Sequence, residues 1–176
     1  MDDPDDLSPA EMQAFVGIPS PFPTDPKKIR ARIRSYERKL AKEKQLIGSC
    51  DDGYGKRFLL GPLYMLVGDV EGALKHYEWF EREFEERGIE PFHLITWCLA
   101  LYKAGRLEDA REMVSITMDA NRYLVPLLLG ENPQEEDGWH GSNYEWLSYA
   151  KAFPRDLVAL WDREALDWLR EMRAEE

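Results

Sequence analysis

An internal repeat restricts the possible folds of this chain more than any other feature of its sequence. The stretch LYMLVGDVEGALKHYEWF aligns with ALYKAGRLEDAREMVSIT, so that Gly68 lies over Gly105 and Ala73 over Ala110, 37 residues apart. Each copy reads as a helix, a glycine turn, an acidic or polar N-cap region and a second helix that carries a small alanine. Glycine permits a tight turn and alanine lets two helices approach closely. The repeat therefore predicts two consecutive helical hairpins.

The rest of the chain also shows helical spacing interrupted by glycine and proline. The expected helices around the repeat run over Lys56 to Val67, Val70 to Arg87, Pro91 to Lys103 and Leu107 to Ala120. In the last third, one helix face is expected from Trp146, Leu147, Ala150 and Phe153. A final helix after Pro154 is expected to bury Leu157, Leu160, Trp161, Leu166, Trp168, Leu169 and Met172. No segment shows sustained strand alternation with hairpin turns, so we expect an all-α fold.

The repeat pattern resembles the tetratricopeptide repeat. The residues that occupy its signature places are Gly61, Tyr64, Gly68, Ala73 and Tyr77 in the first unit, and Trp97, Cys98, Leu101, Gly105 and Ala110 in the second. The offset exceeds the usual period of about 34 residues, and the linker EERGIEP absorbs the difference. Two units are fewer than a solenoid normally needs. The resemblance therefore implies a short α-solenoid of two tetratricopeptide-like hairpins with flanking capping helices.

A more specific resemblance covers roughly residues 51 to 172. The box formed by Asn121, Val125, Pro126, Leu128, Leu129 and Gly130 is similar to one in tetratricopeptide-like proteins of the suppressor-of-tumorigenicity type, common as uncharacterised bacterial proteins. The resemblance implies a helical-repeat fold, and that family has no agreed enzymatic activity. Some relatives carry a cysteine-rich zinc motif at the C-terminus, which this chain lacks, so no metal is carried over. We expect the apolar residues 124–129 to cover the end of the helical stack.

Three segments differ in composition. Residues 1–24 are acidic and proline-rich and are expected to be loosely ordered, with one short helix after Ser8 that contains Met12 and Phe15. Residues 25–48 are expected to form a basic amphipathic helix, with Asp25 as N-cap and Gly48 as the stop. Its narrow apolar stripe predicts packing along one seam only. Residues 54–176 are expected to form the helical domain.

The charge of the chain is distributed unevenly. The net charge is −11, yet nine basic residues lie between Lys27 and Lys44 against Glu37 and Glu43. That segment is therefore +7 and the remainder −18. The acidic excess argues against general binding to nucleic acid or to an anionic membrane. No apolar run approaches the roughly 20 residues of a membrane-spanning helix, the N-terminus resembles no signal peptide, and two cysteines suggest no disulfide framework. We expect a cytoplasmic protein.

Catalytic and metal-binding signals are weak. The histidines His76, His93 and His140 form no metal-ligand spacing, and Cys50 and Cys98 lack the spacing of a redox or zinc motif. The stretch GYGKR follows no strand and lacks the spacing of a phosphate-binding loop. We therefore expect no cofactor, no metal and no enzymatic activity.

An apolar groove is the best candidate for a binding surface. In tetratricopeptide hairpins the first helix of each pair lines a concave face. The residues that this mapping assigns to a partner-binding groove are Phe58, Met65, Leu66, Phe92, Ile95, Leu99, Tyr102 and, at the rim, Lys103. Such a face suits an amphipathic helix or an extended peptide. Alternatively, the 25–47 helix or the C-terminal helices of the same chain fill the groove.

The sequence thus predicts a non-catalytic protein–protein interaction module that binds a protein or peptide partner or a second copy of itself. The alternative is a nucleic-acid-associated accessory protein that uses the basic helix 27–44, since clustered lysine and arginine side chains bind phosphates.

Overall fold

The computed structural model describes residues 17–50, 55–85 and 87–175, and it is all-helical over these residues. None of them belongs to a β-strand, and the only bridge among them joins Ile18 to Pro154. The elements are α1 (Pro26–Ile47), α2 (Lys56–Leu66), α3 (Val70–Phe84), α4 (Pro91–Lys103), α5 (Leu107–Ala120), α6 (Leu124–Leu128), η1 (Asn143–Glu145), α7 (Leu147–Lys151), α8 (Arg155–Val158) and α9 (Arg163–Ala174).

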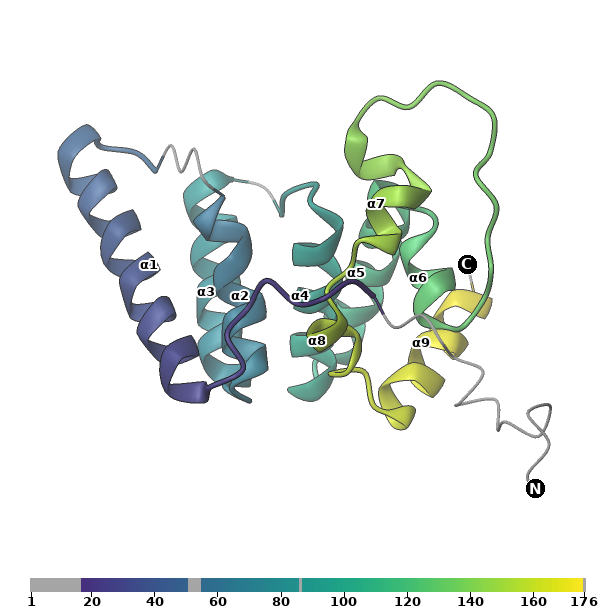
Figure 1. Ribbon diagram of the computed structural model, residues 1–176, viewed down its shortest axis with the longest axis horizontal. Coiled ribbons are helices and arrows are strands. Elements are labelled where there is room, and N and C mark those ends of the chain that lie inside the picture. Colours follow the sequence, from purple (N-terminus) through teal and green to yellow (C-terminus); the bar gives the residue numbers. More distant parts are fainter. Residues whose placement is uncertain (1–16, 51–54, 86, 176) are drawn as a thin grey trace.

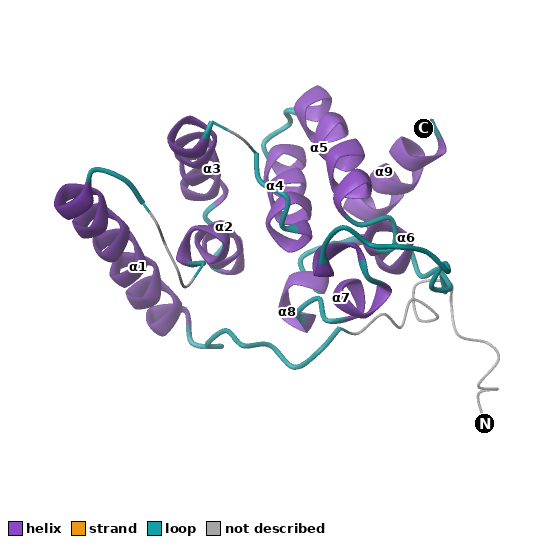
Figure 2. Ribbon diagram, turned by 90° about the horizontal axis from the view of Figure 1, so that it is seen from above, coloured by secondary structure: helices purple, strands orange, loops and turns teal. Residues whose placement is uncertain are grey.

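The helices follow one another along the long axis of the molecule. Helix α1 lies at one end, the hairpins α2–α3 and α4–α5 lie in the middle, and α6 and α9 lie against α5 toward the other end (Figure 1). Viewed from above, α3 and α5 lie on one side of α2 and α4, and α7 and α8 lie on the other (Figure 2). The first helices of the two hairpins are therefore sandwiched between the second helices and the C-terminal helices.

Local signals explain where several helices begin and end. The Asp25 carboxylate accepts a hydrogen bond from the backbone N–H of Lys27, and Gly48 ends α1 in the left-handed conformation. Glu90 caps α4 by accepting from the backbone N–H of His93 at 2.7 Å. The turn between α2 and α3 has Gly68 at φ 72°, a conformation that favours glycine.

The expected close approach within each hairpin is present. Ala73 in α3 and Ala110 in α5 are fully buried. Gly61 in α2 lies directly against the ring of Tyr77, and a Cβ atom at this glycine would collide with that ring. Small side chains at these positions therefore allow the paired helices to pack.

The predicted basic helix forms over its full expected length and packs on its own chain. Ile29, Ile33 and Leu40 are buried, and α1 contacts mainly α2. Ile47, the last residue of α1, is also apolar and falls at helical spacing with these residues, but it is exposed. A single seam therefore holds α1, as its narrow stripe predicts.

Residues 17–24, which belong to the segment expected to be loosely ordered, contact the helical part of the chain at several points. The backbone of Ile18 donates to the carbonyl of Phe153 at 3.1 Å and accepts from the N–H of Arg155 at 3.0 Å. Gly17 is pressed against the carbonyl of Phe153, and Phe22 is buried. These contacts hold the backbone at Gly17 and Ile18 against the segment that joins α7 to α8. The short helix expected around Met12 lies outside the described residues.

The end of α3 and the course of the final helix differ from expectation. Helix α3 ends at Phe84 rather than at Arg87, because Glu85 adopts a left-handed conformation. The single final helix is instead divided into α8 and α9. Asp162 interrupts it by accepting a hydrogen bond from the backbone N–H of Ala165 and thereby capping a new helix.

The apolar residues 124–129, which are expected to cover the end of the helical stack, are buried. All five residues of α6 are buried, and α6 contacts α5 and α7. No helix among the described residues is long and apolar enough to cross a membrane.

Candidate functional site: a groove between α1, α2 and α3

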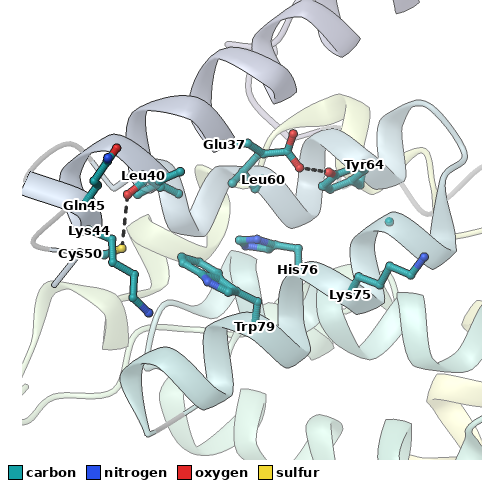
Figure 3. A pocket seen from close by; sticks show the side chains of 12 residues that line it. Glu37, Leu40, Lys44, Gln45, Cys50, Leu60, Tyr64, Lys75, His76 and Trp79 are labelled. Atoms are coloured by element: carbon teal, nitrogen blue, oxygen red, sulfur yellow. Dashed lines mark hydrogen bonds between the residues drawn. The ribbon is translucent and has the colours of Figure 1, made fainter. Parts of the chain in front are cut away.

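A groove of about 600 Å³ lies where α1 diverges from α3 above α2 (Figure 3). This volume is within the range of ligand- and peptide-binding pockets, about 300 to 1,000 Å³. The side chains that line it are Glu37, Leu40, Ala41, Lys44, Gln45, Cys50, Leu60, Tyr64, Gly72, Lys75, His76 and Trp79.

The floor of the groove is apolar. Leu40 of α1 and Leu60 of α2 are almost fully buried beneath it, and Trp79 of α3 forms part of the opposite wall. Two small residues, Ala41 on α1 and Gly72 on α3, also line the groove. Because neither carries a long side chain, the space between the two helices stays open.

The charged groups of the groove lie at its rim and are paired within the chain. Glu37 accepts a hydrogen bond from the Tyr64 hydroxyl, and Lys44 of α1 forms an ion pair with Glu83 of α3. Lys75 pairs with Glu71 at 2.6 Å. Burial, together with the contact to Glu37, raises the pKa of Tyr64 above its ordinary value, so this hydroxyl remains protonated.

His76 is the most deeply placed polar group of the groove. Its Nε2 lies 2.7 Å from the carbonyl oxygen of Arg57, so Nε2 carries the proton that it donates to this acceptor. Burial lowers the pKa of His76 to about 4, although the hydrogen bond to the backbone opposes the shift. The imidazole is therefore neutral at physiological pH, and its ring packs 5.4 Å from that of Trp79.

The thiol of Cys50 is also buried at this site, and its Sγ lies 3.7 Å from the carbonyl oxygen of Leu40. The second thiol, Cys98, lies in the core of the α4–α5 hairpin, and burial raises its pKa well above the ordinary value. A raised pKa leaves little thiolate at neutral pH. Among the residues that the structure describes, no three His, Cys, Asp or Glu side chains are arranged to hold a metal ion.

The groove predicted from the sequence on α4 is filled by the same chain. Phe92 stacks on Tyr149 with ring centroids 4.6 Å apart, and Tyr102 packs on Trp168 at 4.8 Å. Lys103 forms an ion pair with Asp162. Ile95 and Leu99 are buried. Of the two alternatives, the C-terminal helices therefore cover this face, because the aromatic side chains of α7 and α9 pack on α4.

The three predicted positions on α2 are also largely occupied. Phe58 packs against Phe80 and His93 at centroid distances of 5.5 and 5.4 Å, Met65 is buried, and Leu66 is partly buried. None of the eight predicted residues lines the groove between α1 and α3. The predicted residues therefore lie on a face of α2 and α4 that the chain itself covers, whereas the open groove lies on the side of α2 that faces α1. Small residues on α1 and α3 were the signal that could have located the observed groove.

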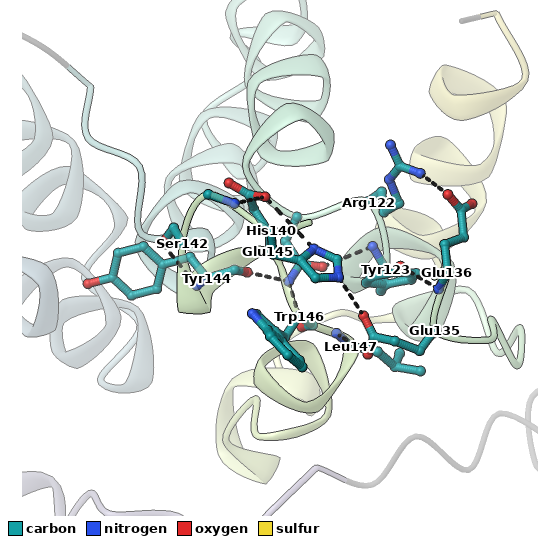
Figure 4. A network of polar contacts seen from close by, with 12 residues as sticks. Arg122, Tyr123, Glu135, Glu136, His140, Ser142, Tyr144, Glu145, Trp146 and Leu147 are labelled. Carbon is teal, nitrogen blue, oxygen red and sulfur yellow. Dashed lines mark hydrogen bonds and ion pairs between the residues drawn. The ribbon is translucent and has the colours of Figure 1, made fainter. Parts of the chain in front are cut away.

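A second polar environment lies at the other end of the molecule (Figure 4). Asn121, at the end of α5, donates from Nδ2 to the carbonyls of Tyr144 and Trp146 at 2.5 and 3.1 Å. Its Oδ1 accepts from the backbone N–H groups of Tyr123 and Leu124. This buried amide therefore joins the end of the second hairpin, the start of α6 and the segment before α7.

The loop that follows α6 is held by further contacts of the same network. Glu135 accepts from the backbone N–H of Leu147 at 2.9 Å and lies 3.4 Å from His140, whose ring packs on Trp146 at 4.9 Å. Trp139 projects from this loop and is 91% exposed. Side chains from both the loop and the end of α5 line a polar cleft of about 360 Å³. The loop is thus anchored at its base, while its tip is open to solvent.

Comparison of the chain with known protein families, curated protein sequences and solved structures returned no match. The function therefore has to be argued from the groove itself.

Proposed function

We propose that the protein is a non-catalytic interaction module that binds an apolar segment of a partner protein in the groove between α1, α2 and α3. The apolar floor of this groove, about 600 Å³ in volume and open between two helices, is the observation that carries the proposal. Its charged groups are paired at the rim, and its histidine is neutral and hydrogen-bonded to the backbone. These properties suit the burial of apolar side chains better than acid–base chemistry.

The architecture that we propose for this module is a short tetratricopeptide-like array. Gly68 and Gly105 occupy equivalent turns at φ 72° and 75°, and Ala73 and Ala110 are both fully buried where the paired helices meet. Successive hairpins contact one another through α2, α3 and α4. In this arrangement α1 covers one end of the array, and α6 and α9 cover α5 at the other. Capping helices are what an array of only two hairpins requires.

A partner helix is the segment that best fits the groove. The α1 side chains that line it run from Glu37 to Gln45, which corresponds to about 12 Å along a helix axis. A helical partner places apolar side chains at positions i, i+3 or i+4, and i+7 on one face, over a similar length. Two turns of such a helix are therefore expected to lie between α1 and α3, with their apolar side chains above Leu40 and Leu60.

Filling the groove tests this proposal. A displayed library of peptides is selected for binding to the full-length protein, and the recovered peptides are then measured against Ala41→Trp, which places an indole in the groove. The matched control is Ala31→Trp, which adds the same side chain to an exposed position of α1 that does not line the groove. We expect Ala41→Trp to weaken binding at least about tenfold, equivalent to about 1.4 kcal/mol, and Ala31→Trp to leave it unchanged. Equal binding to both variants would show that the peptides bind elsewhere.

A further inference from the structure

A continuous row of cations runs along the exposed side of α1. Lys27, Arg30, Arg34, Arg38 and Lys42 are all exposed, and their spacing of three or four residues places them on one face of the helix. Among the described residues, no carboxylate forms an ion pair with any of the five. We call these five residues the basic row.

The basic row borders the groove on its α1 side. Ala41, which lines the groove, follows Arg38 by three residues and Arg34 by seven, so the three side chains lie on neighbouring parts of one helix face. The only carboxylate of α1 that lines the groove is Glu37, and it already accepts from Tyr64. Any helix that lies in the groove therefore presents one of its flanks to unneutralised cations.

Resting on the function proposed above, we propose that the occupant of the groove is an amphipathic helix that carries carboxylates along the flank facing α1. Its apolar side chains bury the floor, and its glutamates or aspartates pair with Arg34, Arg38 and their neighbours. Charge pairs of this exposed kind contribute modestly to affinity, but they set the orientation of the helix and disfavour a helix of the opposite charge.

Other occupants fit this surface less well. A nucleic acid would satisfy the basic row, but it would leave the apolar floor unused, and the remainder of the chain carries −18. A second copy of the chain has no free amphipathic helix of this kind among its described elements. The apolar faces of α3 and α9, for example, are buried in their own fold through Tyr77 and Leu169.

Two synthetic helical peptides with the same apolar face distinguish the possibilities. One carries glutamates along one flank and the other carries lysines at the same positions, and each is titrated with the full-length protein by fluorescence anisotropy at low salt. We expect the glutamate peptide to bind about tenfold more tightly, with a difference that shrinks as salt is added. The double variant Arg34→Glu and Arg38→Glu is expected to reverse the preference. The matched control Lys151→Glu and Arg155→Glu reverses two exposed charges at the other end of the chain and is expected to preserve it.

Each outcome bears on a different statement. If both peptides bind equally and Ala41→Trp weakens both, the acidic-helix inference is wrong while the function proposed for the groove stands. If neither peptide binds, both the inference and the proposed function fail. If a labelled single-stranded RNA of mixed sequence binds at the same salt concentration and Arg34→Glu with Arg38→Glu abolishes its binding, the basic row serves nucleic acid and the inference is overturned. Far-UV circular dichroism establishes that each variant is folded.

Discussion

Mild acid is expected to destabilise this protein, because two of its three histidines are buried as neutral rings. Burial lowers the pKa of His76 to about 4, from an ordinary value near 6.5. Burial also lowers the pKa of His93 well below its ordinary value, and the neighbouring His76 and Arg57 reinforce that shift while the backbone of Arg87 opposes it. Neither ring nitrogen of His93 meets hydrogen-bond geometry with any described group.

The sign of the effect follows from which state binds the protons. Between about pH 6.5 and pH 4 the unfolded chain protonates these histidines and the folded chain does not, so the free energy of unfolding falls as the pH falls. For His76 alone, the pKa difference corresponds to a loss of about 2 kcal/mol between about pH 7.5 and pH 5, and about 3 kcal/mol once the pH is below 4. His93 adds to the loss. Burial raises the pKa of the Glu90 carboxyl, so this group acts in the opposite sense.

Urea denaturation followed by circular dichroism at about pH 7.5 and pH 5 measures this loss. At the lower of these values ordinary carboxylates are still mostly ionised, so the histidines dominate the difference. His76→Gln keeps a donor for the carbonyl of Arg57 without titrating, and His93→Phe keeps an aromatic ring among Phe58, Tyr77, Phe80 and Trp97.

Each of these two variants is expected to reduce the pH-dependent loss, and the double variant is expected to remove most of it. His93→Phe is also expected to raise stability at neutral pH by about 1 to 3 kcal/mol, because it removes two buried ring nitrogens that meet hydrogen-bond geometry with no described group. A wild-type protein equally stable at both pH values would refute the reasoning, as would a double variant that keeps the full loss.

Two further substitutions probe the packing between elements. Asn121→Ala removes the four hydrogen bonds that join α5, α6 and the segment before α7. It is expected to lower the free energy of unfolding, measured by urea denaturation, by about 3 kcal/mol. A loss below about 0.5 kcal/mol would show that the network is dispensable. Gly61→Ala is expected to lower the free energy of unfolding by about 1 to 3 kcal/mol, because the added Cβ collides with the ring of Tyr77. Gly68→Ala is expected to lower it by about 1 to 2 kcal/mol, because only the positive φ at this position opposes a side chain. The Tyr77 hydroxyl is buried and meets hydrogen-bond geometry with no described group, so both glycine variants are measured again in a Tyr77→Phe background and compared with Tyr77→Phe alone. In that background the Gly61→Ala loss should shrink and the Gly68→Ala loss should stay the same, and an unchanged Gly61→Ala loss would rule out the steric explanation.

The boundaries of many helices could be predicted because they depend on residues close together in the chain. Asp25 followed by proline begins α1, and Pro91 begins α4 after a capping glutamate. The turn glycines Gly68 and Gly105 separate the helices of the two hairpins at the expected places. Where a local signal was not used, the prediction failed. Asp162 is as good an N-cap as Asp25, yet the final helix was predicted to run through it.

The groove could not be derived in the same way, because it depends on how helices distant in sequence pack. Hydrophobic spacing shows that Phe92, Ile95 and Tyr102 share an apolar character, but it does not show which other element covers them. In the structure they are covered by Tyr149, Trp168 and the rest of the C-terminal region. The open surface appears instead on the opposite side of α2, where α1 packs along one seam and diverges from α3.

The role proposed for α1 follows from the division of its surface into three faces. Ile29, Ile33 and Leu40 hold the helix on α2, so stability depends on this face. Ala41 and its neighbours line the groove, and no carboxylate among the described residues forms an ion pair with the basic row beyond them. Retaining five exposed cations on a chain whose net charge is −11 contributes little to folding, because exposed charges without partners add little stability. The apolar floor alone would accept a partner helix in either direction. Cations spaced along the edge of the groove would instead select an acidic helix and fix its orientation, because their charge complements that of its carboxylates.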